Sequence, residues 1–193
     1  MKKILAADNL CYSINETKLF QGLSFDLFEG KAIHVLGGNG SGKTSLLKII
    51  SGLSKPTRGS ITKSNKKNVC FVGHKNALKQ YLTVEDNLSL LEVDKHNDIN
   101  AFLKKLELSK LLDVMVASLS YGQQKKLALL RLFLNDSDLL VLDEPCVGLD
   151  KKSQDILCSF LREQKEEKKA LIFSSHISLD IDSENINLDK AIS

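Results

Sequence analysis

Four short, mostly apolar runs along the chain predict strands that are buried on both faces. Each run ends in small or polar residues, which is typical of a central strand in a parallel sheet. Segments with a helical pattern lie between the runs. The expected strands are Ile33–Leu36, Val69–Val72, Leu139–Leu142 and Leu171–Phe173.

The segments between these runs predict helices. In Asp98–Leu112, apolar residues recur three and four positions apart, as they do on the buried face of an amphipathic helix. Strands that alternate with helices indicate an α/β fold, a mostly parallel sheet with helices on both faces. The expected helices are Ser45–Ile50, Asp98–Leu112, Tyr121–Leu134 and Lys151–Lys165.

Two regions depart from this alternation. In the N-terminal 30 residues, Phe20–Leu27 alternates between apolar and polar positions, and Gly22 and Gly30 punctuate the pattern. This pattern predicts an antiparallel β-subdomain. The stretch from about 75 to 132 has helical patterns but no strand, which predicts an inserted helical subdomain. Without a linker or repeat, residues 1–193 are expected to form one domain.

Composition and charge argue against a nucleic-acid-binding protein, a secreted protein and a protein that spans a membrane. Of the 193 residues, 42% are hydrophobic and 26% are charged, and the net charge of +3 is too small to indicate a nucleic-acid partner. Met1–Asp8 is too short for a secretory signal, and no apolar stretch is long enough for a membrane helix. The cysteines form no C-x-x-C pair and are expected to be reduced. We therefore predict a cytoplasmic protein.

The segment after the first buried strand matches G-x-x-x-x-G-K-[ST], the phosphate-binding pattern called the P-loop. Its glycines let backbone N–H groups converge on one point, and the following helix N-terminus attracts anions. Lys43 would reach the β- and γ-phosphates of ATP, and Thr44 would bind Mg²⁺. The alternative is a glycine-rich surface turn. The predicted ATP-binding residues are Gly37, Gly38, Asn39, Gly40, Ser41, Gly42, Lys43, Thr44 and Ser45.

The third buried run leads into two adjacent carboxylates, Asp143 and Glu144. Such a strand end next to a P-loop is expected to hold Mg²⁺ through Asp143. Glu144 would then be the general base that polarises an attacking water. A surface turn that begins with Asp-Glu-Pro is the structural alternative.

A third motif, Leu119-Ser120-Tyr121-Gly122-Gln123, precedes a long apolar helix. Ser120 and Gln123 also satisfy the capping-box pattern, which starts a helix without any ligand. The motif nevertheless resembles the L-S-x-G-Q signature of the ATP-binding-cassette ATPases. All three motifs occur in that family's order, and the resemblance covers nearly the whole chain.

The resemblance implies roles for further residues. Gly148-Leu149-Asp150 is similar to the family's D-loop, and His176 is similar to the switch histidine that donates a hydrogen bond to the γ-phosphate. Tyr12 stands where the family has an aromatic residue that stacks on adenine. The alternatives are an exposed histidine at a strand end and a tyrosine at the edge of the core.

In this family two cassettes face each other, and the signature of one completes the ATP site of the other. The resemblance therefore implies a homodimer with shared sites. Ser120, Gly122 and Gln123 would act across the dimer interface, and so would Asp150.

One position points to a smaller group of proteins within this family. His74 stands nine residues before Thr83-Val84, where most cassettes have a glutamine that contacts Mg²⁺. Gly73-His74 is similar to the haem-exporter ATP-binding subunits of bacterial cytochrome c maturation. A different small transporter cassette remains the alternative.

That resemblance implies an ATPase subunit on the cytoplasmic face of the inner membrane, bound to integral membrane permease subunits. Its ATP hydrolysis would energise haem delivery or release of a haem-loaded chaperone. We expect no direct haem binding, because the chain has no C-x-x-C-H motif.

Three other functions fit the sequence less well. A mechanical or DNA-repair cassette would have either a long coiled-coil insertion between Thr44 and Leu119 or two cassettes in one chain. No heptad run occurs in that stretch, and the chain has one phosphate-binding motif and one signature. A GTPase would need an N-K-x-D motif, and Asn65–Asn68 lacks the acid. A regulatory module that only holds ATP is disfavoured by the retention of both Asp143 and Glu144.

Overall fold

The computed structural model describes residues 1–64 and 68–191, so most of Asn65–Asn68 lies outside the described residues. The chain divides into two compact units. We call them the sheet unit and the helical unit. The sheet unit comprises Met1–His74, Ser137–Pro145 and Leu161–Ser193, and the helical unit comprises Lys75–Asp136 and Cys146–Phe160.

A five-stranded parallel sheet forms the centre of the sheet unit, with the strand order β5-β6-β7-β3-β8. All four predicted strands are present. Every residue of β6 and β7 is buried, as expected, but Val69 and Phe71 of the edge strand are only half-buried. The strands are β3 (Ala32–Leu36), β5 (Val69–Val72), β6 (Leu139–Asp143), β7 (Ala170–Ser174) and β8 (Glu184–Asn187).

The N-terminal residues form antiparallel strands, as the sequence pattern predicts. They are β1 (Lys3–Ile14) and β2 (Thr17–Phe28), and the separate strand β4 (Arg58–Lys63) pairs with the other edge of β1. β4 has no apolar run that would predict a strand. Its pairing with β1 therefore decides its conformation.

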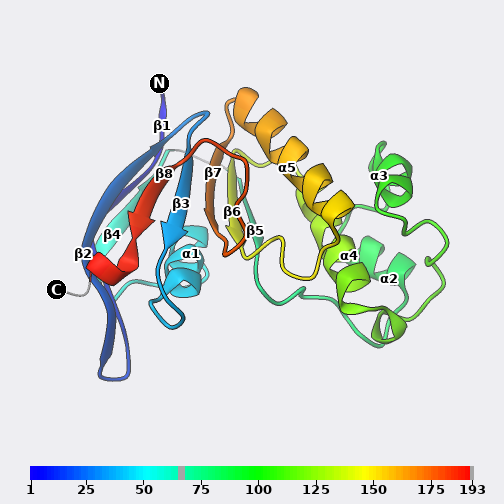
Figure 1. Cartoon of the computed structure of the whole chain (residues 1–193), viewed down its shortest axis with the longest axis horizontal. Helices are drawn as coiled ribbons and strands as arrows, with labels where there is room; N and C mark the ends of the chain where they lie inside the picture. The colour runs from blue at the N-terminus through cyan, green and yellow to red at the C-terminus, as the bar shows by residue number, and fades with distance from the viewer. Residues whose placement is uncertain (65–67, 192–193) are drawn as a thin grey trace. The chain divides into compact units, whose positions relative to one another are not determined.

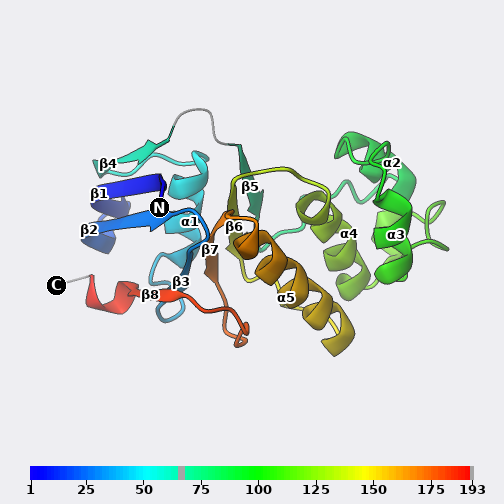
Figure 2. The same ribbon diagram turned by 90° about the horizontal axis from the view of Figure 1, so that it is seen from above.

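Helix α1 (Lys43–Ser51) lies between the two sheets (Figures 1 and 2). Its buried side chains join a core that also contains Leu10 and Phe20 of the antiparallel sheet and Val35 and Val141 of the parallel sheet. Each such aliphatic side chain contributes about 1.5–3 kcal/mol when it is buried. The start of α1, where the phosphate-binding motif lies, is thereby held against the ends of the parallel strands. The buried residues of α1 are Leu46, Leu47, Ile49 and Ile50.

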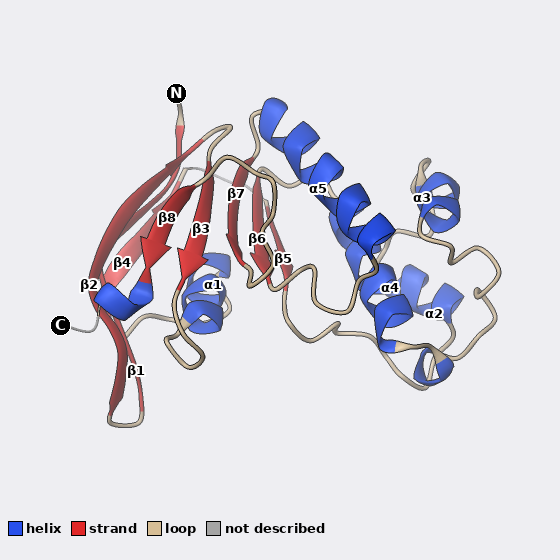
Figure 3. Ribbon diagram, in the orientation of Figure 1, coloured by secondary structure: helices blue, strands red, loops and turns tan. Residues whose placement is uncertain are grey.

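Every regular element that the structure describes in the helical unit is a helix (Figure 3). Phe133 packs against Phe102 at 5.0 Å and against Phe160 at 4.8 Å between ring centroids. No helix in the described part of the chain has the length and apolarity needed to cross a membrane. The helices are α2 (Val84–Leu90), α3 (Ile99–Lys105), the short 3₁₀ turn Val116–Ser118, α4 (Tyr121–Phe133) and the first part of α5 (Lys151–Glu166).

The predicted helix Asp98–Leu112 is wrong at its C-terminal end, because α3 stops at Lys105. Glu107 has φ +63° and donates its N–H to Lys104 O at 3.2 Å, while Leu108 donates to Leu103 O at 2.8 Å. This pair of bonds is a Schellman motif, which satisfies the last carbonyls of a helix and ends it. No residue at this position predicts the helix end, because the motif usually has glycine where Glu107 stands.

Candidate functional site

The phosphate-binding motif forms the turn between β3 and α1. The backbone φ values are 151° at Gly37, 83° at Gly40 and 99° at Gly42, and residues other than glycine rarely adopt such values. A Cβ atom at Gly37 would also collide with Ser41 Oγ. Gly42 caps α1 without any side-chain bond. The N–H groups of the first turn of α1 therefore have no capping side chain to compete with an anion.

Lys43 folds back over this turn. Its Nζ donates to the carbonyl oxygens of Gly37 at 2.7 Å and Gly38 at 2.9 Å. The ammonium group thus lies at the mouth of the glycine turn, where it can neutralise a bound phosphate.

Asp143, at the end of β6, is 2% exposed and accepts two hydrogen bonds from neighbouring elements. Thr44 Oγ1 donates to Asp143 Oδ2 at 2.8 Å, and Ser174 Oγ donates to Asp143 Oδ1 at 2.8 Å. A buried carboxylate needs such partners, because desolvation without them costs several kcal/mol. The structure therefore brings together the two residues predicted to bind Mg²⁺.

Glu144 and His176 also lie together. The backbone N–H of His176 donates to Glu144 Oε2 at 3.1 Å, and His176 Nε2 lies 3.5 Å from Glu144 Oε1. Glu144 is 8% exposed, and its Oε1 is buried without a hydrogen bond. The Glu144 backbone has φ +50°, an uncommon conformation for a side-chain-bearing residue. Its N–H is held by the Ser174 carbonyl at 3.1 Å.

The signature residues begin α4 in the helical unit. Ser120 Oγ accepts from the Gln123 N–H at 3.2 Å, and Gln123 Oε1 accepts from the Ser120 N–H at 2.9 Å. The capping box expected as an alternative is therefore present. A Cβ at Gly122 would lie 2.7 Å from the Gly148 carbonyl oxygen, and a Cβ at Gly148 would collide with the Tyr121 ring. The two glycines let the signature and the predicted D-loop touch.

Asp150 follows this contact and is held by two groups. Lys126 Nζ lies 2.7 Å from Asp150 Oδ2, and the Ser153 N–H donates to Asp150 Oδ1 at 2.8 Å. The Lys126 hydrogen bond, together with those from Ser153, lowers the pKa of Asp150 to about 2. Asp150 is therefore a fixed negative charge beside the start of α5.

The remaining predicted residues lie apart from these clusters. Tyr12 is half-buried near the end of β1 and stacks on Phe20 with ring centroids 6.0 Å apart. His74 is exposed just after β5.

Two residues near the site were missed by the sequence analysis. Ser174 holds Asp143, and its only sequence signal is a small residue after an apolar run. Asp189, in the 3₁₀ turn Leu188–Lys190, accepts from the Gly38 N–H at 3.1 Å with both carboxylate oxygens. Nothing in the local sequence indicates that Asp189 contacts the glycine turn, because the two residues are far apart in the chain.

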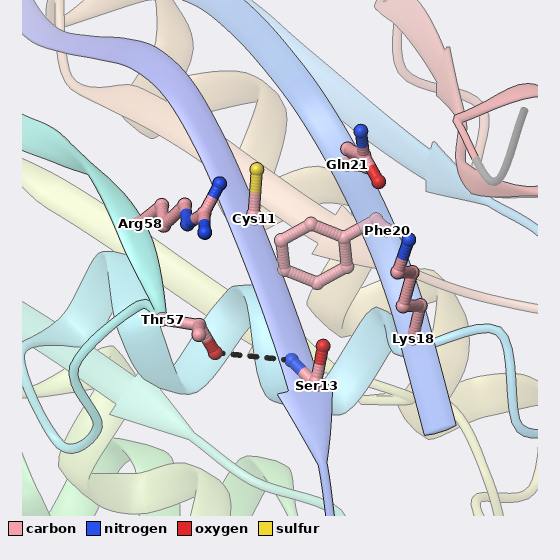
Figure 4. A pocket seen from close by; sticks show the side chains of 7 residues that line it. All are labelled: Cys11, Ser13, Lys18, Phe20, Gln21, Thr57 and Arg58. Carbon is pink, nitrogen blue, oxygen red and sulfur yellow. Dashed lines mark hydrogen bonds between the residues drawn. The ribbon is translucent and has the colours of Figure 1, made fainter. Parts of the chain in front are cut away.

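A pocket of about 260 Å³ lies on the antiparallel sheet (Figure 4). Lys18 and Arg58 line it with Ser13 and Thr57, whose Oγ1 accepts from the Ser13 N–H at 3.1 Å. Phe20 also lines it, and a Cβ at Gly42 would lie 3.2 Å from the Phe20 ring. The pocket therefore shares Phe20 with the surroundings of the glycine turn.

The predicted residues fall into two groups, one in each unit. The sheet unit holds the glycine turn, the paired carboxylates, the switch histidine, Tyr12 and His74. The helical unit holds the signature and the D-loop residues Ser120, Gly122, Gln123 and Asp150.

Comparison with known proteins identifies the family. A family model described as ABC transporter matches residues 20–147. The chain belongs to the ABC transporter family. The resemblance seen in the three sequence motifs is thus confirmed, and this ABC ATPase is an ATP-binding enzyme of the P-loop fold class.

Individual relatives and solved structures agree with the family assignment. The chain is 33% identical to the "Cytochrome c biogenesis ATP-binding export protein CcmA" of Roseobacter denitrificans, over 92% of this chain and 86% of that protein. A putative ABC transporter ATP-binding protein from Pyrococcus furiosus has a similar structure, with a TM-score of 0.81 and 26% identity over 97% of this chain and 98% of that one. The dimeric cassette MJ0796 shares the fold, with a TM-score of 0.75 and 24% identity over 90% of this chain and 88% of that one.

The pKa of Asp150 makes a pH-dependent contribution to the stability of this ABC ATPase. Because the folded-state pKa of about 2 lies below the ordinary 3.8, the stabilisation is present above pH 3.8 and is lost as the pH falls towards 2. Half of the Asp150 side chain is exposed, so we expect Asp150→Asn to cost about 1 kcal/mol or less near pH 7.

Urea unfolding of the wild type and Asp150→Asn between pH 7 and pH 3 measures this difference. It should shrink as the pH falls below 3.8. Asp155→Asn, in the first turns of α5, is the matched control, since it also removes one exposed carboxylate that is paired with a lysine. A difference that stays constant or grows towards acid pH would contradict the assignment.

Proposed function

We propose that this ABC ATPase hydrolyses ATP as the energising subunit of a membrane complex that exports haem, or releases a haem-loaded chaperone, during cytochrome c maturation. The observation that carries the ATPase mechanism is the joint position of Thr44, Asp143, Glu144 and His176 at one end of the parallel sheet. The haem assignment is supported by the similarity to cytochrome c biogenesis ATP-binding export proteins and by His74 in the position where most cassettes have glutamine.

The triphosphate of ATP would bind to the glycine turn. Backbone N–H groups at the start of α1 and the Lys43 ammonium would neutralise its oxygens. Tyr12 would stack on the adenine ring. Ser45, in the first turn of α1, completes the residues that we assign to nucleotide binding.

The oxygen donors of the site fit Mg²⁺. Thr44 Oγ1 and the Asp143 carboxylate are hard ligands, and they already lie 2.8 Å apart. When bound there, Mg²⁺ would supply positive charge to the β- and γ-phosphate oxygens. His74 is a poorer Mg²⁺ ligand than the usual glutamine, because imidazole nitrogen is softer than amide oxygen.

Hydrolysis would use the buried pair at the end of β6. Glu144 Oε1, which accepts no hydrogen bond, would take a proton from the attacking water as its oxygen bonds to the γ-phosphorus. The bond from that phosphorus to the β,γ-bridging oxygen would break and leave ADP and phosphate. His176 Nε2 would donate a hydrogen bond to a γ-phosphate oxygen.

A second copy of the chain would complete each site. Ser120, Gly122 and Gln123 stand at the N-terminus of α4, where backbone N–H groups suit a γ-phosphate from the partner chain. Asp150 would cross the same interface. We therefore propose a homodimer that binds two ATP molecules and docks on permease subunits at the cytoplasmic face of the inner membrane, with no nucleic acid and no direct contact with haem.

We expect Glu144→Gln to lower ATP hydrolysis by about 100-fold or more, because the general base is lost while the shape of the site is kept. The variant should bind MgATP and accumulate as an ATP-bound dimer in light scattering. Glu163→Gln, a change of the same type on the exposed face of α5, is the control and should behave as the wild type. A strictly monomeric Glu144→Gln in saturating ATP would refute the shared-site dimer.

The permease contact should lie on the segment around His74–Asp86. Tyr81 is 69% exposed and Leu78 is half-buried, so this segment offers apolar surface to a partner. Charged residues at Tyr81 and at the half-buried Leu78 should abolish co-purification with the membrane subunits while ATP binding survives. Leu53→Glu, at a 64% exposed position of the sheet unit, is the control. Unchanged co-purification of the Leu78 and Tyr81 variant would exclude this surface.

The haem assignment is tested in cells by a covalent-haem stain. When Glu144→Gln replaces the normal protein, we expect all c-type cytochromes to disappear while non-covalently bound b-type haem is retained. Glu163→Gln again controls for the replacement. Normal c-type cytochromes would remove the haem assignment and would favour another small transporter cassette.

A further inference from the structure

His34 belongs to none of the motifs described above. It lies on the strand that leads into the glycine turn, and it connects this strand to the loop that carries His176. It lies on β3, three residues before Gly37, and is half-buried. Its Nε2 lies 3.1 Å from the Ser175 carbonyl oxygen. A carbonyl can only accept, so the ring nitrogen in this bond must carry the proton and donate.

The ring of His34 is also fixed from the neighbouring strand. β3 and β7 are parallel neighbours in which His34 pairs with Phe173. The two rings stack with centroids 4.6 Å apart and planes at 18°, and Phe173 is 1% exposed. The imidazole is therefore held in one orientation, with its donor directed at the first residue after β7.

Ser175, the acceptor, shapes the turn around His176. Ser175 Oγ donates to the Ile177 carbonyl at 2.6 Å and accepts from the Ile177 N–H at 3.1 Å. His176 lies between these two residues, and its own N–H donates to Glu144 Oε2. A shift of the Ser175 carbonyl would therefore move both the backbone N–H that holds Glu144 and the ring that faces it.

We propose that His34 is a positioning residue for the hydrolytic pair Glu144 and His176, acting through its hydrogen bond to Ser175. This rests on the roles proposed above for the pair. His34 does not touch the glycine turn in any hydrogen bond that the described residues show, so its effect should fall on turnover and leave nucleotide affinity unchanged.

Two variants separate the donor from the ring. His34→Phe keeps an aromatic ring on Phe173 but removes the donor. His34→Gln loses the ring, while its side-chain amide nitrogen reaches about as far as Nε2 of histidine and can donate to Ser175. We expect His34→Phe to lower kcat by about tenfold or more, since small misplacements of catalytic groups have large effects on rate. His34→Gln should retain most of the wild-type kcat.

The measurements are kcat and the Kd for MgATP of the full-length chain, with hydrogen exchange of the His176 amide as a readout that needs no turnover. His34→Phe should leave the Kd within about twofold and speed exchange at His176, and His34→Gln should do neither. If His34→Phe does not fold, His34→Met replaces it, as a side chain of similar length without a donor.

Three results would overturn the inference: a wild-type kcat in His34→Phe, an equal loss in His34→Gln, or a loss confined to the Kd. Glu144→Gln, assayed in parallel, distinguishes failure of the proposed function. If that variant still hydrolyses ATP normally, Glu144 is not the base and the positioning role falls with it. If it is inactive while His34→Phe is normal, only the role of His34 fails.

Discussion

The hydrogen bonds to the Asp143 carboxylate are the interaction on which the rest of this site depends. Thr44 and Ser174 donate to its two oxygens from α1 and β7, so one buried carboxylate ties three elements together. A carboxylate that is 2% exposed tolerates burial only if both donors are in place. The core around α1 and the register that pairs Asp143 with Ser174 are therefore requirements of the site as well as of the fold.

Several functional candidates also have a structural task. Ser120 and Gln123 cap α4, Asp150 accepts from the Ser153 N–H at the start of α5, and the Glu144 side chain holds the N–H of His176. Substitution of such a residue changes local structure and chemistry together. For this reason matched variants that keep one property and remove the other say more than alanine substitutions would.

The sequence predicted the elements with strong apolar patterns, and it predicted the family. Each of the four apolar runs became a strand, because runs of three or four apolar residues are short for a helix and suit a sheet that is covered on both faces. It could not predict the end of α3, where Glu107 adopts a conformation that glycine usually adopts. It also missed β4, whose polar residues are strands only because β1 offers them an edge. Asp189 and His34 were invisible as well, since their roles come from contacts between segments far apart in the chain.

The backbone of Glu144 has a consequence for how this position can change. With φ +50°, any residue other than glycine, asparagine or aspartate is strained there, by about 1–2 kcal/mol. A collection of variants selected only for folding would thus drift towards glycine or asparagine at position 144. Because we propose Glu144 as the general base, we expect selection for turnover to return the carboxylate. With that proposed role, stability and activity would favour different residues at position 144, as is common where backbone strain is retained in an enzyme.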